Sequence, residues 1–403
     1  MENKLLDKIK KIDLILVIVP ALIGVIGIFA INSVTSDYQY YPRAVYIQAI
    51  SFAIGYGLLV LAVRFDVEHF SKFYRIIWFL SILIQLTVFI PGLTDRRYGS
   101  SAWINLGFTT MQPSELVKIT FVIALAAYLR KHREELGTLR GFIRAFMFAI
   151  PIIGLVAYID MGAGIVIAII FIGMVFAAGI KGWLFLRITA VVVLIFPIGY
   201  RFLQDHQTQR FVAWLHPDDM SIPETYQLHQ SKLAIGSGGF FGKGLGNGTM
   251  KEFLPIPESD FIFSMICEEM GLLGGLACIA LFFVMLTRIW RAIADAKEYF
   301  SGLLCVGFMC MFGFQIFENI GMGLGVMPIT GITLPFLSAG GTSVMANMIA
   351  IGLVVGCGMR SRERTYKHVD TDNAPGIPYE SKSDLMKGHP RRLNTSASDR
   401  QFY

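Results

Sequence analysis

Ten apolar stretches, each close to the length needed to cross a lipid bilayer, divide this chain. The hydrocarbon core of a bilayer is about 30 Å thick, so a helix needs about 20 mostly apolar residues to cross it. The predicted spans are residues 13–33, 46–63, 74–91, 114–129, 145–160, 163–180, 183–201, 261–287, 300–327 and 340–358. We therefore predict an all-α polytopic membrane protein with about ten transmembrane helices.

Composition supports this fold class. The 403 residues are 54% hydrophobic and only 16% charged, whereas soluble domains carry roughly 25% charged residues. These values exclude a disordered chain, a disulfide-rich secreted scaffold and an ordinary cytosolic enzyme. The five cysteines lie inside apolar stretches without C-x-x-C or metal-ligand spacing, so we interpret them as small core residues.

The positions of Lys and Arg predict the orientation. Most of the 35 basic residues fall in the tails and in alternate connections, which places both termini in the cytoplasm. The net charge of +6 then faces an anionic lipid leaflet, and no nucleic-acid partner is needed to explain it. We expect a cytoplasmic tail over residues 1–12, one membrane domain over 13–360 and a disordered cytoplasmic tail over 361–403.

Three irregular segments are predicted to share the extracytoplasmic face. Residues 92–113 and 202–260 are too long and polar to be simple turns, and the second forms a large connection between the seventh and eighth helices. Residues 319–343 contain prolines and glycines that interrupt a helix, which is tolerated near a bilayer only where protein or water satisfies the backbone. Together they predict a single outward-facing site.

The first irregular segment carries Trp103, Asn105 and Gln112. It is either a structural loop at the membrane interface, anchored by Trp103, or a part of the site. Just beyond it, Glu115 and Lys118 are spaced to share one face of the fourth helix. Charges at this depth are normally paired, so they form either a structural ion pair or a pair that lines a polar cavity.

The large extracytoplasmic connection is rich in glycine between residues 236 and 248, and it also contains Arg210, Lys232 and Lys243. Exposed backbone N–H groups beside cations suit a phosphate or diphosphate. The alternative interpretation is a flexible linker, because the pattern is not a Walker loop. The histidines of this connection match no metal-site spacing.

Two aspartates lie at helix starts. Asp260 precedes the eighth helix, where its carboxylate either caps the helix or accepts a proton from a hydroxyl nucleophile. Asp160 precedes the sixth helix, and helix capping is the favoured interpretation. Glu268 and Glu269 lie deeper in the eighth span, so they must face protein or water, but the sequence assigns them no role.

Three motifs, in order, resemble the SEDS family, which comprises RodA, FtsW and SpoVE, over about residues 12–360. They are WINLGFTTMQPSELVK, then QSKLAIGSGGFFGKGLGNGT with LPIPESDFIFSMICEEMG, then NIGMGLGVMPITGITLPFLSAGGTS. The first resembles the family's W-I-N and Q-P-S-E-x-x-K pattern, and the second leans toward the RodA branch. The usual His-Thr before the catalytic aspartate is Glu258-Ser259 here, and the final Asn of N-I-G-M-N is Gly323.

The resemblance implies a glycosyltransferase of the bacterial plasma membrane. Members polymerise lipid II into the glycan strands of peptidoglycan, together with a class B penicillin-binding protein. Asp260 matches the family's catalytic aspartate, and Glu115 and Lys118 match its Glu/Lys pair. Trp103, Asn105, Gln112 and Ser338 fall in the matched motifs and are expected to contact substrate.

The expected reaction needs a base for the attacking hydroxyl, which is Asp260, and positive charge on the departing diphosphate. Arg210, Lys232 and Lys243 are the candidates for that charge, with a divalent cation (Mg²⁺ or Mn²⁺) as a further candidate cofactor. Two other functions stay open. A lipid II flippase would need a polar path across the membrane, and a scaffold for a partner enzyme would need neither Asp260 nor the glycine-rich segment.

Overall fold

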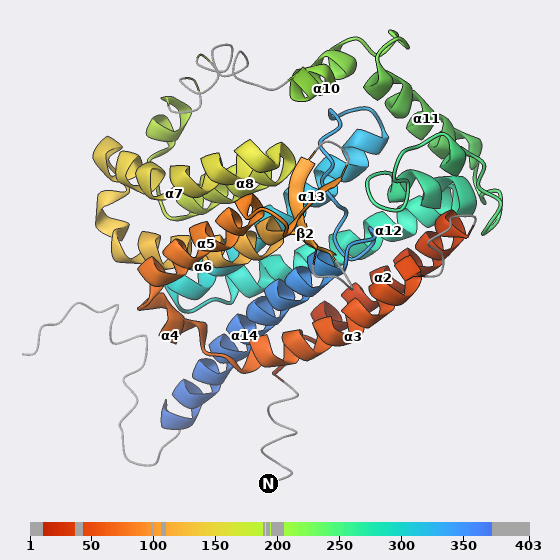
Figure 1. Cartoon of the computed structure of the whole chain (residues 1–403). Coiled ribbons are helices and arrows are strands. Elements are labelled where there is room, and N and C mark those ends of the chain that lie inside the picture. Colours follow the sequence, from red (N-terminus) through yellow and green to blue (C-terminus); the bar gives the residue numbers. More distant parts are fainter. Residues whose placement is uncertain are drawn as a thin grey trace, which may run out of the picture. The chain divides into compact units, whose positions relative to one another are not determined.

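The computed structural model describes residues 11–36, 43–97, 100–105, 110–187, 190, 194 and 205–372. The chain forms two units, Met1–Ser361 and Arg362–Tyr403. The first unit holds the helical bundle shown in Figure 1. In the second unit, the described residues continue helix α14 as far as Asp372, so the start of the segment predicted to be disordered is helical. Residues 1–10 and 373–403 lie outside the described residues.

Nine of the ten predicted spans appear as helices in the described residues. They are α2 (Leu14–Thr35), α3 (Arg43–Arg64), α5 (Tyr74–Leu86), α6 (Pro113–Lys131), α7 (Leu139–Ile159), α8 (Met161–Ala177), α12 (Ile262–Ala294), α13 (Tyr299–Gly323) and α14 (Gly341–Asp372). The remaining predicted span, 183–201, is helical over 182–187 and otherwise lies mostly outside the described residues. Shorter helices are α4 (Val67–Ser71), α10 (Asp205–Leu215) and α11 (Pro223–Ser237).

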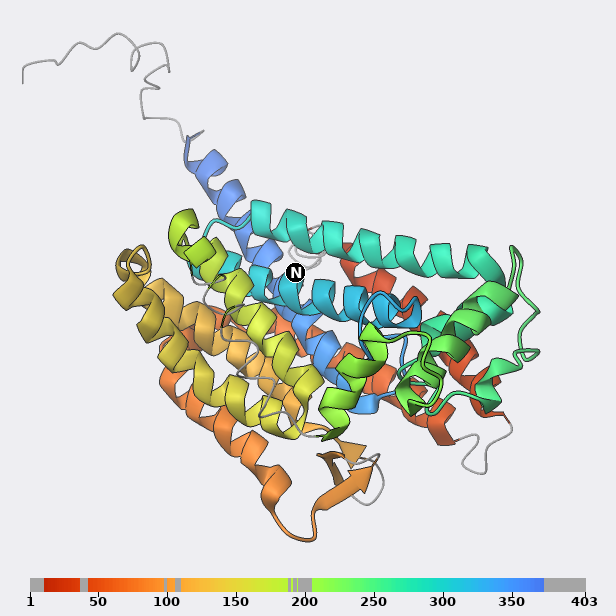
Figure 2. The same cartoon turned by 90° about the horizontal axis from the view of Figure 1, so that it is seen from above.

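Helix α13 lies inside the bundle, packed against α6, α8 and α12, while α2 packs against α3 and α12 (Figure 1 and Figure 2). The core between these helices holds large apolar side chains such as Phe121, Phe308 and Phe312. Helices at the edge also expose apolar residues, including Phe29 of α2 and Phe283 of α12. A helix that is apolar on its buried and exposed faces needs a lipid environment.

Six of the described helices are long and apolar enough to cross a bilayer, and two shorter apolar helices accompany them. The protein is therefore a multi-pass membrane protein, and the predicted helical fold class is confirmed.

A small antiparallel sheet, which the sequence did not predict, forms in the first irregular segment. Its strands are β1 (Thr94–Arg97), β2 (Ser100–Asn105) and β3 (Thr110–Met111), in the order β1-β2-β3. Trp103 of β2 pairs with Asp95 of β1. The hydroxyl of Thr342 donates to the Thr110 carbonyl at 3.3 Å, which fastens the sheet to the start of α14.

Helix α12 is interrupted at Gly271, whose dihedral angles, φ 68° and ψ −164°, are not helical. The part before the break folds back on the part after it, because a Cβ on Gly275 would lie 2.8 Å from Cys267 Sγ and 3.6 Å from Phe263 Cζ. In a straight helix, residues 263 and 275 would be about 18 Å apart. The positive φ explains glycine at this position.

Candidate active site

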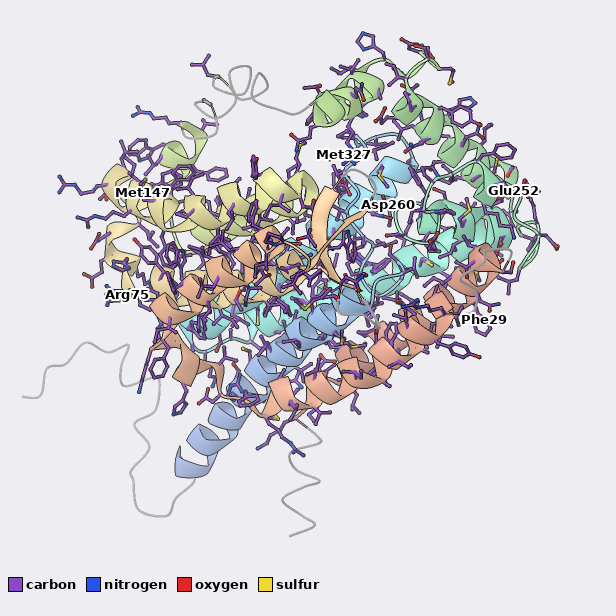
Figure 3. All side chains as sticks on the ribbon, viewed as in Figure 1. Phe29, Arg75, Met147, Glu252, Asp260 and Met327 are labelled. Atoms are coloured by element: carbon purple, nitrogen blue, oxygen red, sulfur yellow. The ribbon has the colours of Figure 1, made fainter. Side chains whose placement is uncertain are left out.

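Asp260 lies at the end of a turn that leads into α12 (Figure 3). The N–H groups of Ser259 and Asp260 both donate to the Ile256 carbonyl, at 3.1 and 3.2 Å. From α13, Asn319 Nδ2 donates to the Asp260 carbonyl at 3.0 Å and to the Ile332 carbonyl at 2.8 Å. One buried amide therefore holds the aspartate turn against the irregular segment that follows α13.

Ser338 fixes the same turn from the other side. Its hydroxyl donates to the Ser259 carbonyl at 2.6 Å, and the Ala339 N–H donates to the Glu258 carbonyl at 2.9 Å. Gln48 of α3 donates to the Ser338 carbonyl at 3.0 Å. The buried Ser338, which the resemblance places among the substrate contacts, thus positions the residues beside Asp260.

The Asp260 carboxylate is only partly exposed, and desolvation by the surrounding protein raises its pKa to about 6. A hydrogen bond from the Ser259 side chain and the charge of Arg210 act in the opposite direction, whereas Asp160 and Glu258 add to the increase. A carboxylate with this pKa is mostly ionised at neutral pH and is a stronger base than an ordinary aspartate, as a general base requires.

Arg210 reaches the site from α10. Its Nη1 donates to the Thr330 carbonyl at 3.0 Å, beside Gly331, whose added Cβ would lie 3.6 Å from Asp260 Oδ2. The structure therefore brings together two residues, Arg210 and Asp260, that are 50 positions apart in the sequence. A guanidinium at this place can bind a phosphate or neutralise the charge of the Asp260 carboxylate.

Glu318 of α13 is a site residue that the sequence analysis missed. It is fully buried, its Oε1 accepts a hydrogen bond from the Thr330 hydroxyl, and its Oε2 has no hydrogen-bond partner among the described residues. Its charge is coupled to those of Asp260 and Arg210. An acidic residue inside a predicted span was the available signal, but its partners lie in segments that local patterns do not connect.

A second polar cluster adjoins the first. Asp160 caps α8 by accepting from the Ala163 N–H at 3.1 Å, as favoured from the sequence, and Gln112 Nε2 donates to Asp160 Oδ2 at 2.7 Å. Burial raises the pKa of Asp160, while the Ala163 hydrogen bond and the charge of Lys118 oppose the increase. Arg210 and Asp260 both interact electrostatically with Asp160, so the two clusters are neighbours.

Glu115 and Lys118 form a buried ion pair in this cluster, with 2.9 Å between Lys118 Nζ and Glu115 Oε1. Within the part of the chain that the structure describes, Glu115 Oε2 has no hydrogen-bond partner. Trp103 and Asn105 lie on β2, where Trp103 is half-buried and Asn105 is exposed. Their expected contact with substrate stays a prediction.

The glycine-rich segment has a different environment from the one we expected. Lys243 Nζ lies 2.6 Å from Glu268 Oε1, so its charge is balanced by a buried carboxylate of α12. Glu268 also accepts from the N–H groups of Thr249 and Met250. These contacts give Lys243 a structural partner, and they explain why a carboxylate lies within the eighth span.

The same segment closes the break in α12. The N–H groups of Lys243 and Gly244 donate to the carbonyls of Glu268 and Glu269, each at 3.0 Å. On the other side of the break, the Leu272 N–H donates to the Gly239 carbonyl at 2.9 Å. Protein groups thus satisfy several of the free backbone groups at both helix ends.

Close packing on this break explains the glycine at position 242. A Cβ on Gly242 would lie 2.1 Å from the Glu269 carbonyl oxygen, and Gly242 has a φ of 84°. Glu269 itself accepts from the Ser33 hydroxyl of α2, which in turn accepts from the Gly246 N–H at 2.9 Å. Lys232 is exposed on α11 beside Gly325, and its phosphate role stays a prediction.

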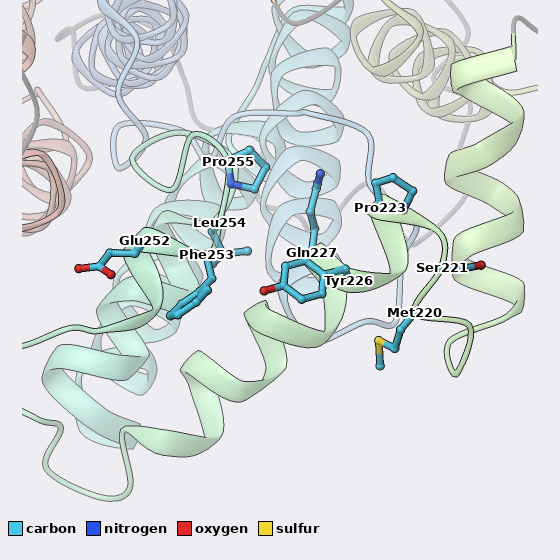
Figure 4. Close-up of a pocket in the computed structure, with 9 residues that line it drawn as sticks. All are labelled: Met220, Ser221, Pro223, Tyr226, Gln227, Glu252, Phe253, Leu254 and Pro255. Atoms are coloured by element: carbon cyan, nitrogen blue, oxygen red, sulfur yellow. The ribbon is translucent and has the colours of Figure 1, made fainter.

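Two further features carry no catalytic assignment. An open groove of about 590 Å³ lies between the α10–α11 connection and residues 252–255, and no predicted site residue lines it (Figure 4). Its lining residues are Met220, Ser221, Pro223, Tyr226, Gln227, Glu252, Phe253, Leu254 and Pro255. The described residues bring together no three His, Cys, Asp or Glu side chains that could hold a metal ion.

A model of the FtsW/RodA/SpoVE family, described as cell cycle proteins, matches residues 10–363. The chain belongs to the FtsW/RodA/SpoVE family. It is 32% identical to the probable peptidoglycan glycosyltransferase FtsW of Coxiella burnetii, over 83% of this chain and 91% of that protein. It is also 32% identical to stage V sporulation protein E of Bacillus subtilis, over 87% of this chain and 98% of that protein.

Solved structures agree with this family membership. The rod shape determining protein RodA of Thermus thermophilus matches with a TM-score of 0.63 at 26% identity, over 88% of this chain and 97% of that one. A chain from a study of polymerization and crosslinking by a peptidoglycan synthase complex matches with a TM-score of 0.74 at 26% identity, over 88% and 98%. These sequence relatives are named FtsW and SpoVE, so the RodA branch stays a prediction for this family member.

Proposed function

We propose that this protein is a peptidoglycan glycosyltransferase that polymerises lipid II, with Asp260 as the general base. The observation that carries the proposal is the placement of a partly exposed aspartate, with a raised pKa, near the guanidinium of Arg210. Membership in the FtsW/RodA/SpoVE family and the names of its relatives support the same reaction.

In the proposed reaction, the 4-hydroxyl of a GlcNAc unit of one lipid II transfers its proton to Asp260. The oxygen forms a bond to the anomeric carbon of MurNAc at the end of the growing strand. The bond from that carbon to the diphosphate oxygen breaks, and undecaprenyl diphosphate leaves with the electron pair. Arg210 is the cation best placed to stabilise the departing charge, because Lys243 is already paired with Glu268.

We further propose that the Asp260 end of the bundle faces the outside of the cell and that both termini are cytoplasmic. The distribution of Lys and Arg along the sequence supports this orientation. At the end of α6 remote from Gln112, Arg130 lies over the Phe300 ring, and Arg133, just after α6, lies over the Tyr299 ring, consistent with a basic cytoplasmic surface.

A class B penicillin-binding protein is the proposed partner. The support is the similarity to a chain from a peptidoglycan synthase complex in which polymerization and crosslinking are coordinated. A partner of this kind would crosslink the strands that this enzyme produces.

The test is strand synthesis from labelled lipid II by the purified protein in lipid nanodiscs, with and without the partner and with and without Mg²⁺ or Mn²⁺. Asp260→Asn should lower the rate by about 10²–10⁴-fold, because it removes the base and keeps the shape of the side chain. Asp219→Asn, an exposed aspartate of the same extracytoplasmic connection, is the matched control and should keep wild-type activity.

A fully active Asp260→Asn variant would remove the assignment of the base. Movement of lipid II across the bilayer without strand synthesis would identify a flippase instead.

A further inference from the structure

We infer that the segment from Leu233 to Met250, which includes Phe240 and Phe241, is a membrane anchor that contacts the acyl chains of the bilayer at the Asp260 end of the bundle. This inference does not depend on glycosyl transfer. It rests on the depth of the segment, on its charge and on its exposed side chains.

The depth follows from two contacts between α2 and α12. At one end, Arg288 Nη1 lies 3.5 Å from Asp13 Oδ2, and at the other end Ser33 bonds to Glu269. The two contacts are separated along α2 by about 30 Å, at about 1.5 Å per residue, which equals the thickness of a hydrocarbon core. Helix α2 carries no charge from Leu14 to Thr35. The Glu269 contact therefore marks the edge of the hydrocarbon at the Asp260 end.

The glycine-rich segment is bonded to α12 at this edge. The Gly244 N–H donates to the Glu269 carbonyl, and the Leu273 N–H donates to the Phe240 carbonyl at 3.4 Å. Phe240 is thus held beside Leu273, at the first turn of the membrane-crossing part of α12. Its ring packs edge to face on that of Phe241, with 5.2 Å between centroids.

Charge separates this segment from the rest of the large connection. Between residues 233 and 250 the only charged residue is Lys243, and Glu268 neutralises it. By contrast, residues 205–232 carry several charged side chains and histidines, ending with Lys232, and residues 251–260 carry further charged side chains. A stretch without net charge can approach the hydrocarbon without the cost of desolvating an ion.

The large exposed side chains of the segment are apolar, while the smaller Ser237, Asn247 and Thr249 are exposed as well. Phe240 is 56% exposed and Phe241 77%, and Leu233 and Leu245 are also exposed. Phe240 and Phe241 adjoin an exposed apolar strip of α12 that begins with Leu272 and Leu273. Contiguous apolar surface at this depth indicates contact with lipid, and aromatic rings are frequent at the membrane interface.

The experiment uses the full-length protein with the photoreactive residue p-benzoylphenylalanine at position 241, reconstituted in nanodiscs of phosphatidylcholine and phosphatidylglycerol. After irradiation, mass spectrometry detects adducts that carry one phospholipid. Phe283, which is 66% exposed on α12, is the matched lipid-facing position, and the exposed Met220, between α10 and α11, is the matched polar-segment position.

We expect phospholipid adducts at positions 241 and 283 in similar yield and at least about fivefold less at position 220. Adducts at 283 but not at 241 would overturn the inference, and so would equal yields at 241 and 220. If position 241 crosslinked only to a co-purifying protein, this face would be a protein interface instead.

Discussion

At the residue scale, Asp260 combines two opposed influences. Burial makes ionisation of its carboxylate harder, whereas Ser259 and Arg210 make ionisation easier, and the result is a pKa of about 6. A general base works only in its ionised form, so the acid side of the pH profile should report this group directly.

We predict that kcat/KM of strand synthesis falls about tenfold per pH unit below about pH 6 and is level from about pH 7 to pH 8. Arg210→Ala should move this acid limb to higher pH, because the lost cation no longer favours the carboxylate. Initial rates over this pH range, measured in one buffer series with lipid II, check both the acid limb of the wild type and its movement in the Arg210→Ala variant. An acid limb near pH 4 would show that burial does not raise the pKa of Asp260.

Glu318 is a buried carboxylate that is joined to Arg210 through Thr330. Glu318→Gln keeps an oxygen that accepts from the Thr330 hydroxyl, so activity should stay within about threefold of wild type. Glu318→Ala leaves that hydroxyl unpaired beside Arg210, and we expect at least about tenfold lower activity with a destabilisation of about 1–3 kcal/mol.

Strand-synthesis assays and thermal unfolding of both Glu318 variants measure these effects. If the Gln variant were as inactive as the Ala variant, the ionisable group itself would be required, beyond its hydrogen bond.

At the element scale, the packing of the glycine-rich segment on the break of α12 can be tested with one methyl group. Gly242→Ala places a Cβ against the Glu269 carbonyl oxygen at a residue with positive φ, and should destabilise the protein by about 1–3 kcal/mol. Gly236→Ala is the matched control, because a Cβ on this α11 residue meets no atom within 4 Å. It should be neutral or stabilising by up to about 1 kcal/mol.

Thermal unfolding in the same detergent compares the two glycine variants. Equal unfolding temperatures would contradict the close approach of the segment to α12. A change in KM for lipid II without a change in stability would instead favour the phosphate-binding interpretation of this segment.

At the scale of the whole molecule, length and hydropathy predicted the helices because each span is encoded by adjacent residues. The predicted span 114–129 became α6 (Pro113–Lys131), with Pro113 at the first turn, where proline is tolerated. The small sheet was missed because its strands are short and β2 does not alternate clearly between apolar and polar residues.

The site was predicted only in part for a related reason. Asp260 and the Glu115–Lys118 pair lie in local motifs, and the sequence was sufficient to select them. The pairing of Lys243 with Glu268 and of Thr330 with Glu318 depends on how distant segments fold together. No periodicity in one sequence carries that information, and the break at Gly271 lies inside an unbroken apolar pattern.

The break at Gly271 also has a consequence for adaptation to different membranes. The helix after the break must match the thickness of the lipid, whereas the short helix before it, which begins just beyond Asp260, is held by α13 and the segment after α13. A change in bilayer thickness can therefore be absorbed by tilt of the part of α12 after the break. The position of Asp260 is set separately by these contacts, so hydrophobic mismatch and the placement of this carboxylate are uncoupled.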